Sequence, residues 1–299
     1  MSPITAIQQN GSTPAPAAAF DLDAYFRRIG YTGERTASRA TLSALILHHA
    51  QTIPFENLNP LLRWPVRLDL PSLQQKLVYD GRGGYCYEHN LLFSQVLQTL
   101  GFQVTHLAGR VMWNVPEGVV PPRSHMILRI DFDQQPYIVD VGFGGMTLTD
   151  ALRLEPDIEQ TTPHEPYRLI KANDLFVLQA NVGGEWRSLY RFDLQEQLLT
   201  DYEVTNWYIS NHPNSHFISG LIAGRSDPDR RYALRNNVLA VHYLDGRNER
   251  HELTTVAELR AALTEVMQIA LPDTPELDAV LQRLISLSPE SQPVPHRSA

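Results

Sequence analysis

The chain has 299 residues, of which 43% are hydrophobic and 19% charged, and its formal net charge is −8. This composition is that of an ordinary globular protein and excludes disorder over most of the chain. The acidic balance, without basic runs interleaved with aromatic residues, excludes a nucleic-acid partner. Any phosphate-bearing ligand therefore has to be held locally, by arginine residues or by backbone amides.

The cysteine content and the hydropathy of the chain indicate its cellular compartment. The single cysteine, Cys86, excludes disulfides within the chain and multi-cysteine metal clusters. The sequence lacks a signal peptide pattern, and no segment approaches the ~20 apolar residues that a membrane span needs. We therefore expect a cytoplasmic protein without a metal, a tightly bound cofactor or a membrane attachment, present as a monomer or a homodimer.

The N-terminal third of the chain predicts a helical bundle. Residues 1–19 are rich in Ser, Thr, Pro and Ala without periodicity, which predicts a disordered tail. Apolar residues then recur with helical spacing, Asp21 or Asp23 can cap the first helix, and Gly101 can end the last one. Helices are predicted at about residues 24–30, 41–51, 70–78 and 86–100. We assign residues 20–103 to this bundle.

From about residue 104 the pattern changes to β-rich runs separated by Pro, Gly, Asp and Gln. The runs cover residues 104–113, 125–132, 136–143, 167–172, 175–182 and 186–194. Their length and spacing predict an antiparallel sheet or a small barrel, which we assign to residues 104–205.

The C-terminal part predicts a smaller α/β domain over residues 206–287. Two strands flank the turn residues Asp245 and Gly246, and Thr255 with Glu258 forms a capping box for a helix. A last helix begins near Pro275, and residues 288–299 predict a second disordered tail. The fold class is therefore α+β, with a helical bundle, a central β domain and an α/β domain.

The lone thiol lies in a setting that favours reactivity. Cys86 begins a predicted helix, whose unpaired amides and partial positive charge favour the thiolate, and Arg82 lies four residues upstream. Gly83 and Gly84 would let a substrate approach the sulfur, while nearby amides would stabilise an oxyanion. Each feature alone also fits a structural role, namely a packed cysteine and a simple turn.

A thiol nucleophile needs a base, and His125 is the candidate. His125 begins and Asp140 ends two predicted strands joined by a turn at residues 133–136. Antiparallel neighbours bring their outer ends together, so the two side chains can touch. Either residue alone can equally satisfy backbone groups at a strand end. Together with Cys86 they point to a catalytic triad.

Three segments resemble the active-site signatures of the arylamine N-acetyltransferases: RGGYCYE at 82–88, RSHMILRI at 123–130 and YIVDVGFGG at 137–145. IPFENLNP at 53–60 and DLDAYFRRIGYTG at 21–33 resemble that family's N-terminal segments. The resemblance implies a helical bundle, an antiparallel β-barrel and an α/β lid. It also implies acetyl transfer from acetyl-CoA to the nitrogen of arylamines or arylhydrazines, and to the oxygen of N-hydroxyarylamines.

The same resemblance assigns roles to individual residues. It implies that Cys86 carries the acetyl group in a two-step exchange and that His125 and Asp140 complete the triad. Further residues fall into three groups: Phe143, Phe55 and Tyr87 for the acceptor, Gly142, Gly144 and Gly145 near the CoA pyrophosphate, and Arg82 with Glu56 as a supporting ion pair. Phe143 and Phe55 can equally be core residues, and Arg82 can be a solvated charge.

Three other functions remain compatible with the sequence. An amide synthase of the same fold would transfer a larger acyl chain from a carrier protein to an aromatic amine. A papain-like or transglutaminase-like hydrolase or transamidase carries Cys, His and Asp in the same order. A protein that binds CoA or an arylamine, with an idle thiol, is the non-enzymatic alternative.

Overall fold

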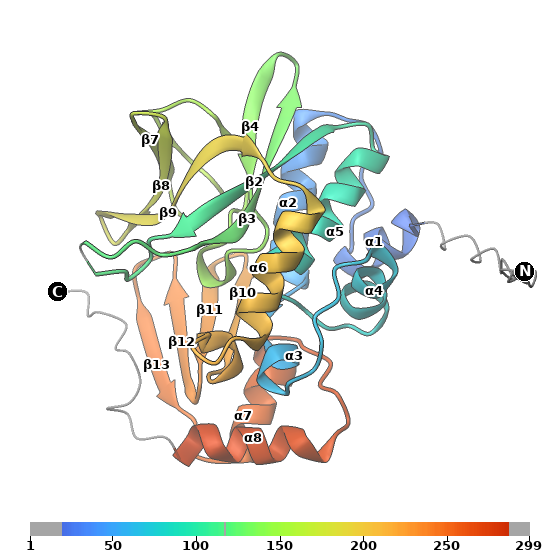
Figure 1. Cartoon of the computed structure of the whole chain (residues 1–299), viewed down its shortest axis with the longest axis vertical. Helices are drawn as coiled ribbons and strands as arrows, with labels where there is room; N and C mark the ends of the chain where they lie inside the picture. Colours follow the sequence, from blue (N-terminus) through green and yellow to red (C-terminus); the bar gives the residue numbers. More distant parts are fainter. Residues whose placement is uncertain (1–19, 117, 287–299) are drawn as a thin grey trace, which may run out of the picture.

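The computed structural model describes residues 20–116 and 118–286, so both predicted tails lie outside the described residues. The described chain forms a helical region, a curved β-sheet and a second sheet flanked by helices, in that order along the sequence (Figure 1). This is the α+β architecture expected from the sequence. None of the helices in these two ranges is both long and apolar enough to cross a membrane.

The N-terminal region is helical because its apolar residues share faces and its helix starts are capped. Asp21 accepts a hydrogen bond from the Ala24 amide at 2.8 Å and caps the first helix. Leu42, Leu45 and Ile46 are fully buried in the bundle core. The elements are α1 (Leu22–Ile29), α2 (Arg39–Thr52), β1 (Phe55–Glu56), α3 (Leu58–Leu61), α4 (Leu70–Gln74), the π-helical turn η1 (Gln75–Tyr79) and α5 (Cys86–Thr99).

Eight antiparallel strands form the central sheet, in the order β5-β4-β3-β2-β9-β8-β7-β6. They are β2 (Gln103–Val111), β3 (Arg123–Phe132), β4 (Gln135–Val139), β5 (Leu152–Arg153), β6 (Glu159–Gln160), β7 (Tyr167–Ala172), β8 (Leu175–Val182) and β9 (Glu185–Glu196). The Gln160 side chain bridges the two edges by bonding the Arg153 amide at 2.8 Å and the Arg153 carbonyl at 3.0 Å. The sheet is therefore a nearly closed barrel.

The C-terminal sheet has five strands in the order β1-β10-β11-β12-β13. Its strands are β10 (Ile222–Asp227), β11 (Arg230–Arg235), β12 (Val238–Tyr243) and β13 (Asn248–Glu252), and the short β1 joins it from the N-terminal region. The remaining elements are the 3-10 turns η2 (Gly144–Met146) and η3 (His216–Ile218), the helices α6 (Leu199–Asn211), α7 (Val256–Ala261) and α8 (Pro275–Ser286), and the π-helical turn η4 (Ala262–Val266).

The structure differs from the sequence prediction around α6. The expected boundary between residues 205 and 206 falls inside this helix, and residues 199–205 are helical rather than part of the barrel. Val204 and Trp207 are 73% and 63% exposed, so apolar residues on the outer face mask the helical periodicity. Tyr202 and Ile209, on the inner face, pack into the same core as the N-terminal helices.

The sequence pattern also does not predict strands β10 and β11. Both carry buried arginines, Arg225 and Arg231, whose charge hides the strand pattern. Arg231 is 1% exposed and pairs with Glu165 at 2.7 Å, which ties the second sheet to the barrel. A buried, paired arginine is read as a surface residue when only the sequence is known.

Candidate active site

Cys86 is the first residue of α5 and is 5% exposed. Its Sγ lies 3.8 Å from the carbonyl oxygen of Ser124 on β3. The Tyr85 amide donates to Glu88 Oε2 at 3.1 Å, which fixes the start of the helix. The thiol therefore sits where the helix amides point and where the bundle meets the barrel.

His125 and Asp140 come together because β3 and β4 form a tight hairpin. Leu128 pairs with Val139, and the two turn residues Asp133 and Gln134 both have positive φ. His125 Nε2 lies 2.6 Å from Asp140 Oδ2. Since this nitrogen is taken by the carboxylate, Nδ1 is the nitrogen left for the thiol.

The electrostatics of the pair favour charge separation. Burial alone would lower the pKa of His125, but Asp140 and then Cys86 raise it to about 10. Burial would raise the pKa of Asp140, but His125, the Asn90 amide and the Gly142 amide together lower it. At neutral pH His125 is therefore an imidazolium that faces a carboxylate.

Asn90 belongs to this site although the sequence did not single it out. It lies four residues after Cys86 on α5, so it shares the helix face of the thiol. Its amide donates to Asp140 Oδ1 at 3.0 Å and to the Met126 carbonyl at 2.9 Å. The i, i+4 spacing from Cys86 was the signal that could have identified it.

Tyr190 of β9 is a second residue that the sequence did not reveal. Its ring centroid lies 4.9 Å from that of His125 and 5.3 Å from that of Phe143. The Tyr190 hydroxyl is buried, and burial followed by the Asp140 charge raises its pKa. No local pattern marks this residue, because β3 and β9 are brought together only by the barrel.

Arg82 and Glu56 form a buried ion pair beside the thiol loop. Arg82 Nε and Nη2 lie 2.9 and 2.6 Å from Glu56 Oε1, and Nη2 also donates to Asn59 at 3.0 Å. Lys76 pairs with Glu88 at 2.7 Å in the same cluster. The expectation that Arg82 activates the thiol directly is not supported, because its donors are directed to Glu56 and Asn59.

The glycines near Cys86 allow close packing. A Cβ atom on Gly83 would overlap the Pro54 carbonyl oxygen, and one on Gly84 would lie 2.7 Å from Glu88 Oε2. These two glycines therefore bring the thiol loop against its neighbours, which differs from the expected role of admitting substrate. Gly142 is similar, because a Cβ atom there would lie 2.8 Å from the Cα of Cys86.

The three glycines expected near the CoA pyrophosphate do not share one environment. The Gly142 amide donates to Asp140 Oδ1 at 2.9 Å and is therefore not free for a pyrophosphate. Gly144 and Gly145 form the turn η2 between Phe55 and the second sheet.

Three aromatic residues were expected to contact the acceptor. The Phe143 ring stands edge-on to His125 at 5.1 Å, and Phe55 stacks on His89 at 6.3 Å. Tyr87 is 1% exposed and packs 5.4 Å from Tyr202 in the core. Phe143 thus contacts the triad directly, whereas core packing accounts for Tyr87.

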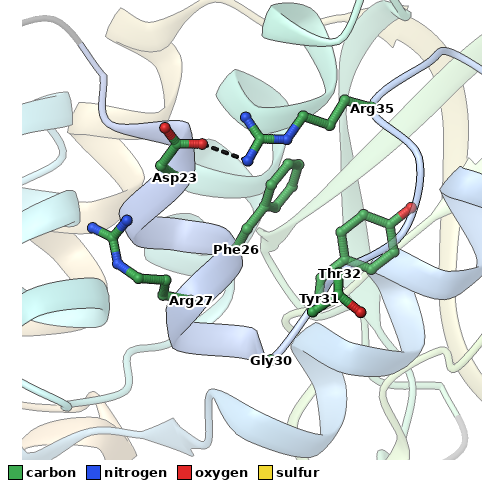
Figure 2. A pocket seen from close by; sticks show the side chains of 7 residues that line it. All are labelled: Asp23, Phe26, Arg27, Gly30, Tyr31, Thr32 and Arg35. Carbon is green, nitrogen blue, oxygen red and sulfur yellow. Dashed lines mark ion pairs between the residues drawn. The ribbon is translucent and has the colours of Figure 1, made fainter.

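A separate hollow of about 390 Å³ lies on α1 and the following loop (Figure 2). Arg35 pairs with Asp23 at 2.5 Å across it and stands over the Phe26 ring. No triad residue lines this hollow. In the described parts of the chain no group of three His, Cys, Asp or Glu residues is arranged to hold a metal ion.

A helix-terminal thiol beside a buried, charged His–Asp pair is the arrangement of a thiol-dependent enzyme. Comparison with known proteins narrows this class. A family model described as N-acetyltransferase matches residues 39–276. The arylamine N-acetyltransferase of Mycobacterium tuberculosis is 44% identical over 273 residues, which cover 90% of this chain and 96% of that protein. The chain belongs to the arylamine N-acetyltransferase family and is an acyltransferase.

Two further comparisons bear on ligands. A Salmonella typhimurium protein named arylamine N-acetyltransferase / N-hydroxyarylamine O-acetyltransferase is 37% identical, covering 89% of this chain and 88% of its own length. The solved structure of Mycobacterium marinum arylamine N-acetyltransferase in complex with CoA has a TM-score of 0.85 and 41% identity. That match covers 88% of this chain and 99% of the neighbour.

Proposed function

We propose that this protein transfers the acetyl group of acetyl-CoA to the nitrogen of arylamines and arylhydrazines through an acetyl-Cys86 thioester. The observation that carries the proposal is the geometry at the helix start: Cys86 heads α5 while His125 and Asp140 lie 2.6 Å apart. Family membership and the CoA complex of the M. marinum neighbour support acetyl-CoA as the donor.

In the first step the Cys86 thiolate attacks the acetyl carbonyl carbon, and a C–S bond forms while the bond to the CoA sulfur breaks. The amides at the start of α5 stabilise the oxyanion of the tetrahedral intermediate. His125, held as an imidazolium by Asp140, donates its proton to the departing CoA sulfur. The products are acetyl-Cys86, neutral His125 and CoA as a thiol.

In the second step the amine nitrogen of the acceptor attacks the acetyl-Cys86 carbonyl. A C–N bond forms, the C–S bond of the thioester breaks, and His125 accepts the proton that the amine loses. The enzyme returns to its thiolate–imidazolium state. Phe143 contacts the edge of His125 and is the side chain that we expect to meet the aromatic ring of the acceptor.

We also propose transfer of the acetyl group to the oxygen of N-hydroxyarylamines. The name of the Salmonella typhimurium relative includes this activity. The hydroxyl oxygen would attack the same acetyl-Cys86 thioester, with His125 again accepting the proton. No additional residue is needed, because only the attacking atom of the acceptor changes.

The first test is the intact mass of the protein after mixing with acetyl-CoA alone. Wild type should gain one acetyl group, and both Cys86→Ala and His125→Ala should gain none. Addition of an arylamine should return the original mass and yield the N-acetyl product. A wild type that gains no mass while its thiol still alkylates rapidly would instead favour an amide synthase that uses a larger acyl donor.

The same experiment separates hydrolysis from transfer. A hydrolase would lose the acetyl group to water at the same rate with and without the arylamine, because water access to the thioester decides the outcome. We expect the acetylated form to persist until the acceptor is added. A thiol that neither acetylates nor alkylates would indicate a binding protein without this chemistry.

A further inference from the structure

Three arginine side chains lie next to one another on three adjacent strands of the barrel. Arg110 of β2 pairs in register with Arg123 of β3 on one side and with Arg191 of β9 on the other. Residues directly opposite in antiparallel strands share one face of the sheet. Because like charges in this relationship destabilise a sheet, the cluster lowers stability unless an anion compensates it.

A groove of about 230 Å³ lies between these side chains. Its walls are the three arginines, Asp193 and three apolar residues. Three cations and one carboxylate leave a local net charge of +2, in a protein whose overall formal charge is −8. The groove is therefore a cationic site on an acidic molecule.

The three guanidinium groups differ in their hydrogen-bond partners. Arg110 donates to the Pro121 carbonyl at 2.7 Å, and Arg123 donates to Asp193 at 2.9 Å. The side chain of Arg191 makes no hydrogen bond or ion pair with any described residue. It is half-buried, so its charge attracts an anion more strongly than a fully solvated arginine would.

The groove lies at the same end of the barrel as the thiol. A register shift between Gly109 and Arg110 sets Gly109 opposite His125 and Arg110 opposite Arg123. His125 and Arg123 therefore lie two residues apart on β3 but project from opposite faces. The residue between them is Ser124, whose carbonyl oxygen contacts Cys86 Sγ.

Tyr202 of α6 connects the two places. Burial and then the Cys86 charge raise the pKa of Tyr202, whereas Arg123 lowers it. The Tyr202 hydroxyl donates to the Leu107 carbonyl on β2 at 2.9 Å, and its ring lies 5.4 Å from that of Tyr87, the residue after Cys86.

We propose that the groove binds a phosphoryl group of CoA, an inference that rests on the proposed use of acetyl-CoA as donor. A phosphate monoester carries a charge of about −2 near neutral pH, and arginine recognises phosphate through paired N–H donors. The Gly142 amide already donates to Asp140, so it is not available to donate a hydrogen bond to this phosphate. Arg191 supplies the free cation, and Arg110 and Arg123 border the same anion.

The test measures the dissociation constants of CoA and of dephospho-CoA by calorimetry in the Cys86→Ala background. Arg191→Gln should weaken CoA binding about three- to tenfold, as expected for one half-exposed charged hydrogen bond. Arg191→Lys should retain part of the affinity, because the charge remains while the paired donors are lost. The control is Arg250→Gln on the exposed strand β13, which removes an arginine with no side-chain partner among the described residues.

The two ligands identify the phosphate. A loss for CoA but not for dephospho-CoA supports binding of the 3′-phosphate, and an equal loss for both supports binding of the pyrophosphate. The proposal is overturned if Arg191→Gln and Arg250→Gln bind CoA equally, or if the Cys86→Ala protein does not bind CoA. Dependence of CoA binding on Arg191 together with no acetylation of wild-type Cys86 would instead retain the groove and reject the proposed function.

Discussion

His125 Nε2 and Asp140 Oδ2 lie 2.6 Å apart in a place where both side chains are almost fully buried. The other carboxylate oxygen of Asp140 accepts hydrogen bonds from Asn90 and from the Gly142 amide. The carboxylate is therefore held from two sides by groups that donate to it. Its charge is the principal reason why His125 keeps its proton at neutral pH.

Asp140→Asn should reduce kcat/KM for acetyl transfer by about 10³- to 10⁴-fold, as a wrongly held histidine does in related triads. The amide cannot stabilise an imidazolium, and it can offer a donor where His125 needs an acceptor. The burst of CoA release in stopped-flow experiments measures the effect on the first step. A variant within tenfold of wild type would contradict the role assigned to Asp140, provided its circular dichroism is unchanged.

The acetylation rate should fall as the pH rises toward the His125 pKa of about 10, because the imidazolium that protonates the CoA sulfur is then lost. In Asp140→Asn the fall should move to lower pH, since burial lowers the pKa of His125 and Asp140 opposes it. Single-turnover rates measured between pH 6 and pH 10.5 would test both statements. If the rate falls over the same alkaline pH range in both proteins, Asp140 does not set the pKa of His125.

Local signals predicted most of the helices, most of the barrel strands and the core of the candidate site. Asp21, Gly101 and the Asp245–Gly246 turn mark ends of elements, and the predicted barrel runs coincide with strands. A two-strand hairpin was enough to place His125 beside Asp140, because it is a local structure. Sequence reasoning succeeded where neighbours in space are also near in the chain.

The remaining features depend on contacts that no local pattern encodes. Tyr190 reaches His125 only through the pairing of β9 with β2. The Gly83 and Gly84 positions look like an open turn in the sequence, but Pro54 and Glu88 fill the space beside them. Long-range packing thus determined that neighbouring residues, rather than open space, lie beside these two glycines.

A chain of hydrogen bonds through two buried histidines makes the thiol loop sensitive to acid. His89 Nε2 donates to the Gly84 carbonyl at 3.0 Å. His49 Nε2 lies 2.8 Å from His89 Nδ1, and His49 Nδ1 lies 2.8 Å from the Tyr25 hydroxyl. Burial lowers the pKa of His89 to about 4, against a value of about 6.5 when unfolded. The unfolded state therefore binds more protons below this upper value.

Stability from neutral His89 should be complete above about pH 6.5 and lost as the pH falls toward 4. We expect the melting temperature of wild type to decrease over this window. His89→Gln can keep a donor to the Gly84 carbonyl without titrating, so its melting temperature should depend less on pH there. Parallel curves for the two proteins would show that His89 is not the responsible group.

Removing the Arg82 charge should destabilise the fold before it alters the chemistry. Arg82→Gln leaves Glu56 buried with only part of its compensation, which typically costs about 3–5 kcal/mol. Urea unfolding should show this loss, and adding Glu56→Gln should restore part of it. The control, Arg247→Gln, breaks an exposed pair with Asp245 and should leave the urea midpoint close to that of wild type. Equal effects of Arg82→Gln and Arg247→Gln would refute the supporting role of the buried pair.

Gly83 provides the sharpest test of how the thiol loop is held. In Gly83→Ala the new methyl group would overlap the backbone oxygen of Pro54, which cannot move without displacing β1. We expect a large drop in soluble yield and melting temperature, and slower alkylation of Cys86 in the protein that does fold. The matched control is Gly145→Ala, where the Cβ atom would meet Ala233 at an ordinary 3.7 Å and φ is not positive. This control should melt within a few degrees of wild type, corresponding to less than about 1 kcal/mol. If Gly83→Ala melts as the control does, the loop is not held against Pro54, and its glycines would be available to admit substrate to the thiol.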